Sequence, residues 1–572
     1  MSPPTTLAIL PILTFLVVVP AARATTYHED AEGYYATGSI HLLNDEVRDA
    51  ITDLTKAIEL NPQHIEAYYK RGLALSQDGQ PAKAVEDFSR ALALDARMFK
   101  AYAGRGRARA ALGDLAGAIE DQSMVIALRP QHPETYQAYC DRGDARRQSG
   151  DLVGAIEDYT QAVAINHLAP EAYDRRADAR RDLGDVTAAM EDYSVSIALG
   201  PHHASAYHRR GLVRWEQGDA EAALADLTAA IELDPQDAKA YHNRGVVREH
   251  RGDLAGAVAD YAQEIALMPD AEQGYASRGA IRWRQGDLEG AVDDLTKQIA
   301  LNPQAVRAYD QRGQVRWQQQ RVEEAIKDYT HALALDPAQA TVYVRRGAAR
   351  MSQGDYRGAI DDYTSAIDRD PSSAETFGYR GEARRRQGDL EGAIADYTTS
   401  LARDPESADA YVARAQLRGQ IGELASAIDD YSNALARQPD LRSALYNRGL
   451  LWHRRGDIER ALADYSAAIA LDSSYAQAYY NRALARGSRG ETDAAIMDYT
   501  AAIGASPSYA EAYHNRGILR GKSGDRPGAI ADLEQAARLD PRLQPSLRKI
   551  LDSLRGSRAQ SPASPSAPPA HH

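Results

Sequence analysis

Cysteine is almost absent from this 572-residue chain, which contains only Cys140. A single thiol excludes an internal disulfide framework and any zinc site that needs several thiolates. Phe and Trp are also rare, at four residues each, whereas Tyr occurs 32 times. Such an imbalance is unusual for the core of a large enzyme. The mean hydropathy of −0.51 excludes a protein with many membrane spans.

Positive charge is in deficit, because 67 Lys and Arg residues stand against 81 Asp and Glu residues, for a net charge of −14. Phosphate binding needs a basic surface, so this balance argues against nucleic acid as the main partner. Catalytic motifs are missing as well: the sequence has no phosphate-binding Gly loop, no GxSxG elbow and no Cys/His pair of catalytic type. We therefore expect no enzyme, no cofactor and no metal site.

One apolar run stands at the start of the chain, from Leu7 to Val19, and Ala22-Arg23-Ala24 follows it. The run is too short to span a bilayer comfortably, and the three residues have the small-x-small shape of a signal peptidase site. We expect residues 1–24 to be a signal peptide and the protein to be exported to a bacterial periplasm or beyond. Because Met1–Thr6 contain no Lys or Arg, an uncleaved membrane anchor and a misassigned start codon remain alternatives.

The rest of the chain repeats with a period of 34 residues. The dipeptide Arg-Gly or Arg-Ala returns at every step, and one step is 37 residues long instead of 34. The second residue of the dipeptide has the numbers 72, 106, 143, 177, 211, 245, 279, 313, 347, 381, 415, 449, 483 and 517, and Gly38 adds a copy at the front. The pattern predicts 15 repeats over residues 31–541, with a three-residue insertion near 130–135.

The unit Ala204–Pro235 shows what one repeat forms. Three residues spaced i, i+4, i+7 share one face of a first helix: Tyr207, Gly211 and Arg214. Gly218-Asp219 then ends that helix and caps a second one, which Pro235 stops. A helical hairpin of this size cannot bury its apolar face alone, so the units must stack.

These features resemble the tetratricopeptide repeat family. The resemblance lies in the 34-residue length, an aromatic residue at position four, Gly at eight, Ala at twenty, an aromatic residue or Leu at twenty-four, a small residue at twenty-seven and Pro at thirty-two. The chain departs from the general pattern by placing Tyr in the first aromatic position and Arg at positions seven and eleven. The resemblance implies an all-α fold, a right-handed α-solenoid, in which the first helices line a concave groove that binds peptides or partner helices.

Two further segments follow the last repeat. Leu547, Ile550, Leu551 and Leu554 have helical spacing, so we expect a C-terminal capping helix over residues 542–555. Residues 556–572 are rich in Pro, Ser and Ala and predict a disordered tail.

Acidic and basic residues also follow the repeat. All 15 repeats have Asp at position twenty-three, and 14 have Arg at position seven. So many equivalent copies argue for a structural role. We expect each Arg to form a bidentate ion pair with an Asp on the second helix of its own or the preceding repeat.

Candidate ligand residues share a face of the first helix at positions five, nine and twelve. In repeats six to nine this face carries Trp215, Trp283, Trp317, Glu249, His208, His242 and Asp310. Trp is strongly enriched at binding hot spots, so we hypothesise that these repeats carry the main ligand surface. Two alternatives remain: the Trp side chains fill gaps between neighbouring first helices, or the His residues bind a metal, although they lack a HExxH or other ligand spacing.

A second group of candidates lies near the C-terminus, in repeats 13 to 15. It consists of Tyr446 and Tyr480 at position five and of Asn447, Asn481 and Asn515 beside this position. The Asn series resembles the groove residues of tetratricopeptide proteins that hydrogen-bond a peptide main chain.

Taken together, these features favour a non-catalytic protein–protein interaction scaffold or adaptor. One alternative is an envelope-structural or carbohydrate-binding repeat protein, because Tyr, Trp and His line the candidate face together with Asn and Asp. Another is a substrate-recruiting subunit of an enzyme complex. The partner itself cannot be identified from repeats that serve many processes.

Overall fold

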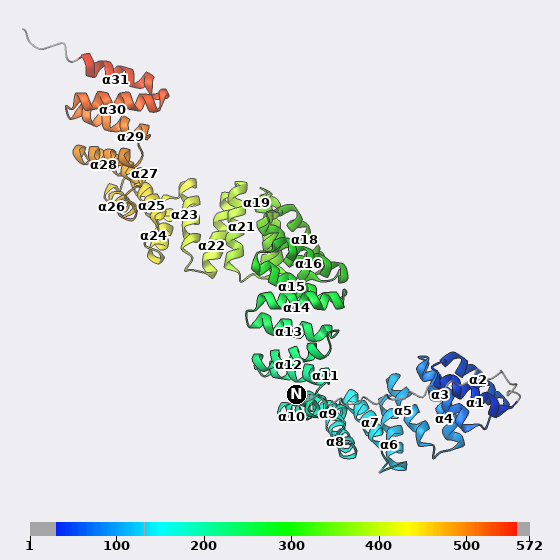
Figure 1. Cartoon of the computed structure of the whole chain (residues 1–572). Coiled ribbons are helices and arrows are strands. Elements are labelled where there is room, and N and C mark those ends of the chain that lie inside the picture. Colours follow the sequence, from blue (N-terminus) through cyan, green and yellow to red (C-terminus); the bar gives the residue numbers. More distant parts are fainter. Residues whose placement is uncertain (1–29, 131, 557–572) are drawn as a thin grey trace, which may run out of the picture. The chain divides into compact units, whose positions relative to one another are not determined.

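The computed structural model describes residues 30–130 and 132–556, and these residues form helices joined by short turns (Figure 1). The chain divides into two compact units, Met1–Gly274 and Tyr275–His572. The expected signal peptide, residues 1–24, lies outside the described residues, as does the expected tail beyond Gly556. None of the described helices is both long and apolar enough to cross a membrane.

The helices of the first unit follow one another as hairpins, each an odd-numbered first helix and an even-numbered second helix. They are α1 (Ala31–Leu43), α2 (Val47–Leu60), α3 (Ile65–Gln77), α4 (Pro81–Leu94), α5 (Phe99–Ala111), α6 (Leu115–Leu128), α7 (Thr135–Ser149), α8 (Leu152–Ile165), α9 (Pro170–Leu183), α10 (Val186–Leu199), α11 (Ala204–Glu216), α12 (Ala220–Leu233), α13 (Ala238–His250) and α14 (Leu254–Leu267).

The second unit continues the same order, and its division from the first falls within α15. Its helices are α15 (Glu272–Gln285), α16 (Leu288–Leu301), α17 (Val306–Gln318), α18 (Val322–Leu335), α19 (Ala340–Ser352), α20 (Tyr356–Arg369), α21 (Ala374–Gln387), α22 (Leu390–Arg403), α23 (Ala408–Ile421), α24 (Leu424–Arg437), α25 (Arg442–Arg455), α26 (Ile458–Leu471), α27 (Ala476–Ser488), α28 (Thr492–Ala505), α29 (Ala510–Lys522), α30 (Arg526–Leu539), the short 3-10 helix η1 (Pro541–Leu543) and α31 (Gln544–Gly556).

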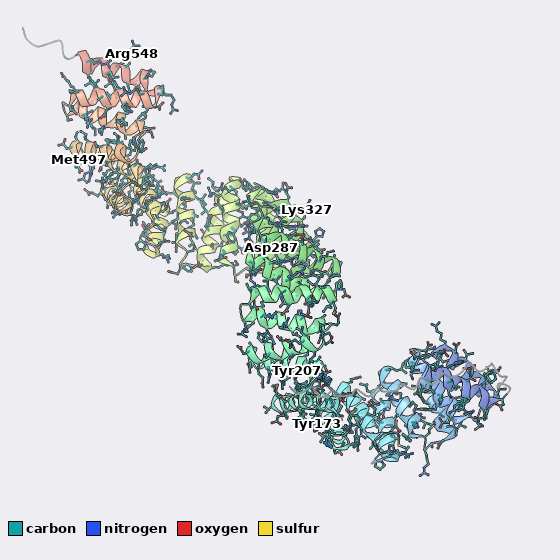
Figure 2. All side chains as sticks on the ribbon, in the orientation of Figure 1. Tyr173, Tyr207, Asp287, Lys327, Met497 and Arg548 are labelled. Carbon is teal, nitrogen blue, oxygen red and sulfur yellow. The ribbon has the colours of Figure 1, made fainter. Side chains whose placement is uncertain are left out.

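A left-handed residue and an acidic cap turn the chain within each hairpin. Between α15 and α16, Gly286 has a φ of 83°, a conformation that suits residues without a Cβ. Asp287, labelled in Figure 2, then accepts a hydrogen bond of 3.0 Å from the backbone N–H of Gly290 and caps α16. Gly takes the left-handed position in most hairpins, whereas Asp45 (φ 64°) and Gln320 (φ 62°) take it in two.

Close packing inside each hairpin depends on the small residue at position eight. A Cβ on Gly245 would lie 2.8 Å from Cε1 of Tyr261, so in this repeat the ring packs directly against the glycine. Tyr261 is fully buried, as are Tyr159, Tyr193 and Tyr465 at the same position of other repeats. Many of the abundant Tyr residues therefore belong to the hydrophobic core. Their amphipathic rings bury carbon surface between the helices.

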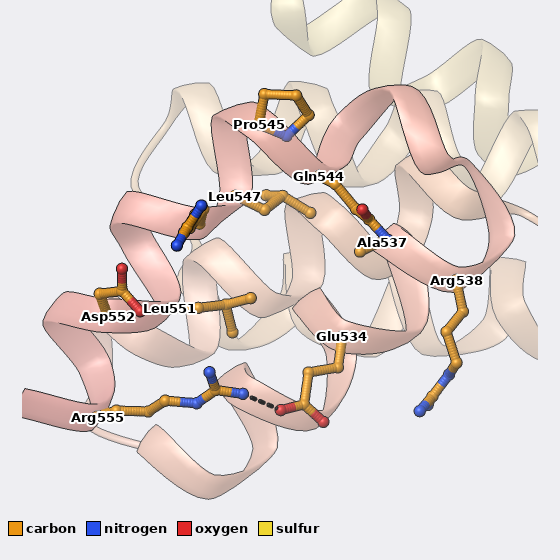
Figure 3. Close-up of a pocket in the computed structure, with 10 residues that line it drawn as sticks. Glu534, Ala537, Arg538, Gln544, Pro545, Leu547, Leu551, Asp552 and Arg555 are labelled. Atoms are coloured by element: carbon orange, nitrogen blue, oxygen red, sulfur yellow. Dashed lines mark hydrogen bonds and ion pairs between the residues drawn. The ribbon is translucent and has the colours of Figure 1, made fainter.

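The last helix, α31, covers the apolar end of α30. Leu547 is fully buried against Leu533 and Ala536, and Ile550, Leu551 and Leu554 pack around them. The helix expected over 542–555 thus corresponds to η1 and α31. Figure 3 shows the groove between α30 and α31, where Arg555 forms an ion pair of 2.5 Å with Glu534 across the two helices.

Candidate functional site

A ladder of ion pairs runs through the hairpins. In α17 and α18, Arg312 donates from Nε to Oδ2 of Asp328 over 3.0 Å and from Nη2 to Oδ1 over 2.7 Å, and Arg316 adds a bond of 2.7 Å to Oδ2. Asp328 is buried, so the two guanidinium groups compensate its charge. The expected bidentate pair is confirmed, and it forms within one repeat, not between repeats.

The same arginines also link neighbouring hairpins. Nη1 of Arg312 donates to the Thr296 hydroxyl of the preceding second helix over 3.0 Å, and Arg346 makes the equivalent bond of 3.1 Å to Thr330. Each of the three guanidinium nitrogens of Arg312 thereby makes a hydrogen bond within the protein. The ladder therefore joins the two helices of a hairpin and links that hairpin to the preceding one.

We call the side chains at positions five, six, nine and twelve of the first helices the ligand face. Position six of one hairpin reaches back to the preceding hairpin. In the second unit, Nη1 of Arg345 donates to both carboxylate oxygens of Asp310, over 2.9 and 2.7 Å. Burial raises the pKa of Asp310, and the charge of Arg345 opposes this shift. Such bonds order the side chains of this face.

In the first unit, the candidate histidines pair with carboxylates. His208 contacts Asp237 through Nδ1 at 2.8 Å, and its Nε2 lies 2.8 Å from Nδ2 of Asn243 at position six of the next hairpin. His242 contacts Glu264 at 2.9 Å. No group of three or more His, Cys, Asp or Glu that could hold a metal ion occurs in the described part of the chain. Both candidate histidines are therefore paired with carboxylates of the protein itself.

Glu249, the candidate between the tryptophans, accepts a hydrogen bond of 3.2 Å from the hydroxyl of Tyr261. Tyr159 and Tyr193 likewise donate to Asp144 and Asp178, over 2.7 and 2.5 Å. The hydroxyls of these three buried Tyr rings thus reach the ligand face, where they meet acidic side chains.

Two of the candidate tryptophans lie against the next first helix. Trp215 packs edge-on against His250 with ring centroids 5.0 Å apart. Trp283 donates from Nε1 to Oε1 of Gln318 over 2.8 Å. These contacts agree with the alternative in which Trp fills gaps between neighbouring first helices.

Trp317 differs from the other two, because 38% of its surface is exposed. It lies in the second unit at a pocket of about 440 Å³ whose wall also includes Trp283, Gln314, Gln318, Tyr329, Arg345 and Ala348. Arg345 is already paired with Asp310 there, so the pocket offers an aromatic wall and amide groups without an unbalanced charge.

The C-terminal candidates bond to one another in pairs. Nδ2 of Asn481 donates to the Tyr446 hydroxyl over 2.9 Å, and Nδ2 of Asn515 donates to the Tyr480 hydroxyl over 3.0 Å. Asn447 bonds to Tyr431, whose pKa burial raises to about 12. Each of the three amides therefore joins its own hairpin to the preceding one.

Two residues outside the expected set depart from the repeat pattern. Glu264 lies on a second helix at position twenty-seven, which is otherwise small in most repeats, and it lines a pocket of about 390 Å³ beside His242. Trp452 replaces the Arg of position eleven, and its ring stacks with the guanidinium groups of Arg460 and Arg455, at 4.6 and 5.8 Å. Comparing the repeats position by position would have found both.

Comparisons with solved structures found similar repeat proteins. A crystal structure of MamA is 27% identical and covers 30% of this chain and 94% of its own, with a TM-score of 0.29. YrrB, described as a TPR protein with an unusual peptide-binding site, is 20% identical and covers 33% of this chain and 97% of its own, with a TM-score of 0.31. A tetratricopeptide repeat protein from Parabacteroides merdae is 21% identical and covers 44% of this chain and 98% of its own, with a TM-score of 0.33.

No curated protein matched the sequence. Protein-family models matched most of it. A tetratricopeptide repeat model matches residues 69–133, 140–204, 208–272 and 344–408. A TPR repeat model matches residues 38–79, 313–353 and 451–488, and a further tetratricopeptide repeat model matches 476–509. With its stacked helical hairpins and these matches along its length, the chain belongs to the tetratricopeptide repeat family.

Proposed function

We propose that this protein is a non-catalytic scaffold that binds a protein partner on its ligand face, with the pocket around Trp317 as an anchor point. Tetratricopeptide repeats support protein–protein interaction as a class. The observation that carries the proposal is the exposed ring of Trp317 in a pocket of about 440 Å³. Partly exposed Trp side chains beside a pocket are typical of binding hot spots.

The groups around Trp317 are ordered by contacts within the protein. The indole N–H of Trp283 donates a hydrogen bond to Gln318, and Arg345 donates to both carboxylate oxygens of Asp310. Gln314 also donates to Asp310, over 3.0 Å. A partner therefore loses little affinity to the ordering of these side chains when it binds.

Affinity capture from an envelope extract, followed by mass spectrometry, tests this proposal. The wild-type chain is compared with Trp317→Ala and with Met497→Ala, a control on α28 whose side chain is 72% exposed. We expect a defined set of proteins with the wild type and with Met497→Ala and its loss with Trp317→Ala, at equal helicity by circular dichroism. Undiminished capture by Trp317→Ala contradicts the proposal. Retention on glycan with no captured protein supports the carbohydrate-binding alternative instead.

We also propose that the protein acts outside the cytoplasm. The support is the apolar run Leu7–Val19 followed by Ala22-Arg23-Ala24. Cell fractionation combined with N-terminal sequencing tests this: a mature chain that begins at Thr25 in the periplasmic or extracellular fraction is expected. A chain that keeps Met1 and fractionates with the membrane supports the uncleaved anchor, and one that keeps Met1 in the cytoplasm contradicts export.

A further inference from the structure

Repeat seven carries a carboxylate at a position that the other repeats keep small. Position twenty-seven is Ala, Ser or Val in thirteen repeats, and the exceptions are Glu264 and Gln298 in repeats seven and eight. Glu264 is only 6% exposed. Removing a carboxylate from water costs free energy unless a partner compensates it. Packing alone therefore does not explain why Glu stands here.

A second departure from the pattern makes room for Glu264. Position three is Ala in eleven repeats but Gly274 in repeat eight. A Cβ at Gly274 would lie 2.9 Å from Oε2 of Glu264 and 3.0 Å from its Cδ. The missing methyl group thus provides the space that the carboxylate occupies. The two departures from the repeat pattern, Glu264 and Gly274, fit each other in space, which indicates a specific binding site.

The carboxylate lies at a pocket of about 390 Å³ in the first unit. His242 contacts its Oε2 at 2.9 Å, while its Oε1 receives no hydrogen bond from the described residues. Met268 and Ala271 form an apolar wall, and the half-buried Glu272 adds a second carboxylate to the lining.

We propose that this pocket binds a lysine or arginine side chain of the protein partner, with Glu264 as its counter-ion. The inference rests on the proposed function, since it names the chemistry of the partner. The long methylene chain of such a residue fits the wall of Met268 and Ala271, while its charged head meets Oε1 of Glu264.

The charges around the pocket favour a cation. Glu264 presents Oε1 to the pocket, and the one Lys or Arg side chain of the lining, Lys239, lies exposed at the rim. The net charge of the whole chain, −14, attracts a basic partner at longer range.

A small probe separates this pocket from the rest of the ligand face. Saturation-transfer NMR on the full chain compares Nα-acetyl-arginine methylamide with the citrulline analogue, which has the same shape without the charge. We expect saturation transfer to the methylene groups of the arginine compound and none to those of the citrulline compound. Equal signals from the two compounds, or none from either, overturn the proposal.

A double variant supplies the matched control. Glu264→Ala with Gly274→Ala restores the pair of residues that most repeats carry, so the helices keep their packing. We expect loss of the arginine signal and about tenfold weaker binding of the captured partner. An undiminished probe signal in this variant overturns the proposal. If the partner is captured but the probe does not bind, the assignment of this pocket to a basic side chain fails, while the scaffold function stands. If the probe binds but no protein is captured, the scaffold function fails by itself.

Discussion

Arg244 binds Asp260 of the same hairpin through two parallel hydrogen bonds, from Nε to Oδ2 over 3.0 Å and from Nη2 to Oδ1 over 2.7 Å. Arg248 adds a third bond of 2.8 Å to Oδ2. Asp260 is 2% exposed, so these two guanidinium groups replace the water that the carboxylate loses on folding.

Replacing Asp260 by Ala should destabilise its hairpin strongly. The change leaves two partly buried guanidinium groups without a counter-ion, and breaking a buried pair in this way costs about 3–5 kcal/mol. Hydrogen exchange of α13 and α14 measures the effect locally, which suits a solenoid whose repeats open separately. Glu221→Ala, which removes only the exposed partner of Arg251, is the control and should change little. Equal exchange in both variants contradicts the ladder as a source of stability.

Gln320→Gly should stabilise the turn between α17 and α18. Gln320 has a φ of 62°, and a left-handed conformation costs an ordinary residue about 1–2 kcal/mol. Because Gly also has more freedom in the unfolded chain, we expect a net gain of about 1 kcal/mol. Slower hydrogen exchange in these two helices and a higher melting temperature report it.

The neighbouring position provides the comparison for that change. Gln319 has a φ of −73°, which any residue adopts, so Gln319→Gly should destabilise the same turn. If both Gln319→Gly and Gln320→Gly increase stability, the left-handed conformation of Gln320 is not the cause of the increase.

Trp283→Ala and Trp317→Ala should separate stability from binding. Trp283 packs on the cluster of Ala291, Val292 and Leu295 and bonds to Gln318, so its loss should cost about 2 kcal/mol. Trp317 is more exposed, so its loss should leave the melting temperature nearly unchanged while capture of the partner fails. Thermal denaturation and the capture assay are read on the same preparations. If Trp283→Ala reduces capture and Trp317→Ala does not, Trp317 is not a binding hot spot.

Cys140 should react slowly with alkylating reagents in the folded protein. The side chain is buried, and this burial raises the pKa of its thiol to about 11. A pKa above the solution pH leaves the thiol neutral, so about one molecule in a thousand carries the reactive thiolate at pH 8. Iodoacetamide labelling followed by mass spectrometry should be slow in buffer, fast in urea, and about tenfold faster per pH unit between pH 7 and 9 in the native state. Equal rates in buffer and urea contradict the buried position.

The hairpins could be predicted from the sequence because each repeat carries the same local signals. Gly218-Asp219 marks the turn of its repeat, and the fixed spacing of Tyr207 and Gly211 marks the buried face of the first helix. The partner of each Arg was harder to assign. Asp residues of two repeats lie within reach of a long side chain, and only the packing shows that Arg210 bonds to Asp226 of its own hairpin.

The ligand face was predictable by position but not by exposure. Trp215, Trp283 and Trp317 share position twelve, yet the side chains of the next helix decide which rings are covered. Glu264 could not be predicted from the shared positions, because it is a departure of one repeat from the residues that the others carry at position twenty-seven.

The placement of the ladder also bears on how many repeats such a chain can hold. From repeat two onward, the ladder Asp at position twenty-three is paired with Arg of its own hairpin, as Asp226 is with Arg210 and Arg214. The neighbouring repeat contributes a hydroxyl to the ladder arginine, as Ser194 does to Arg210, and nearly every repeat carries one at this position. Deletion or duplication of a whole repeat therefore leaves no ladder carboxylate without its arginine. The chain can change its length in steps of 34 residues, and so the extent of surface it offers to partners, at little cost in folding.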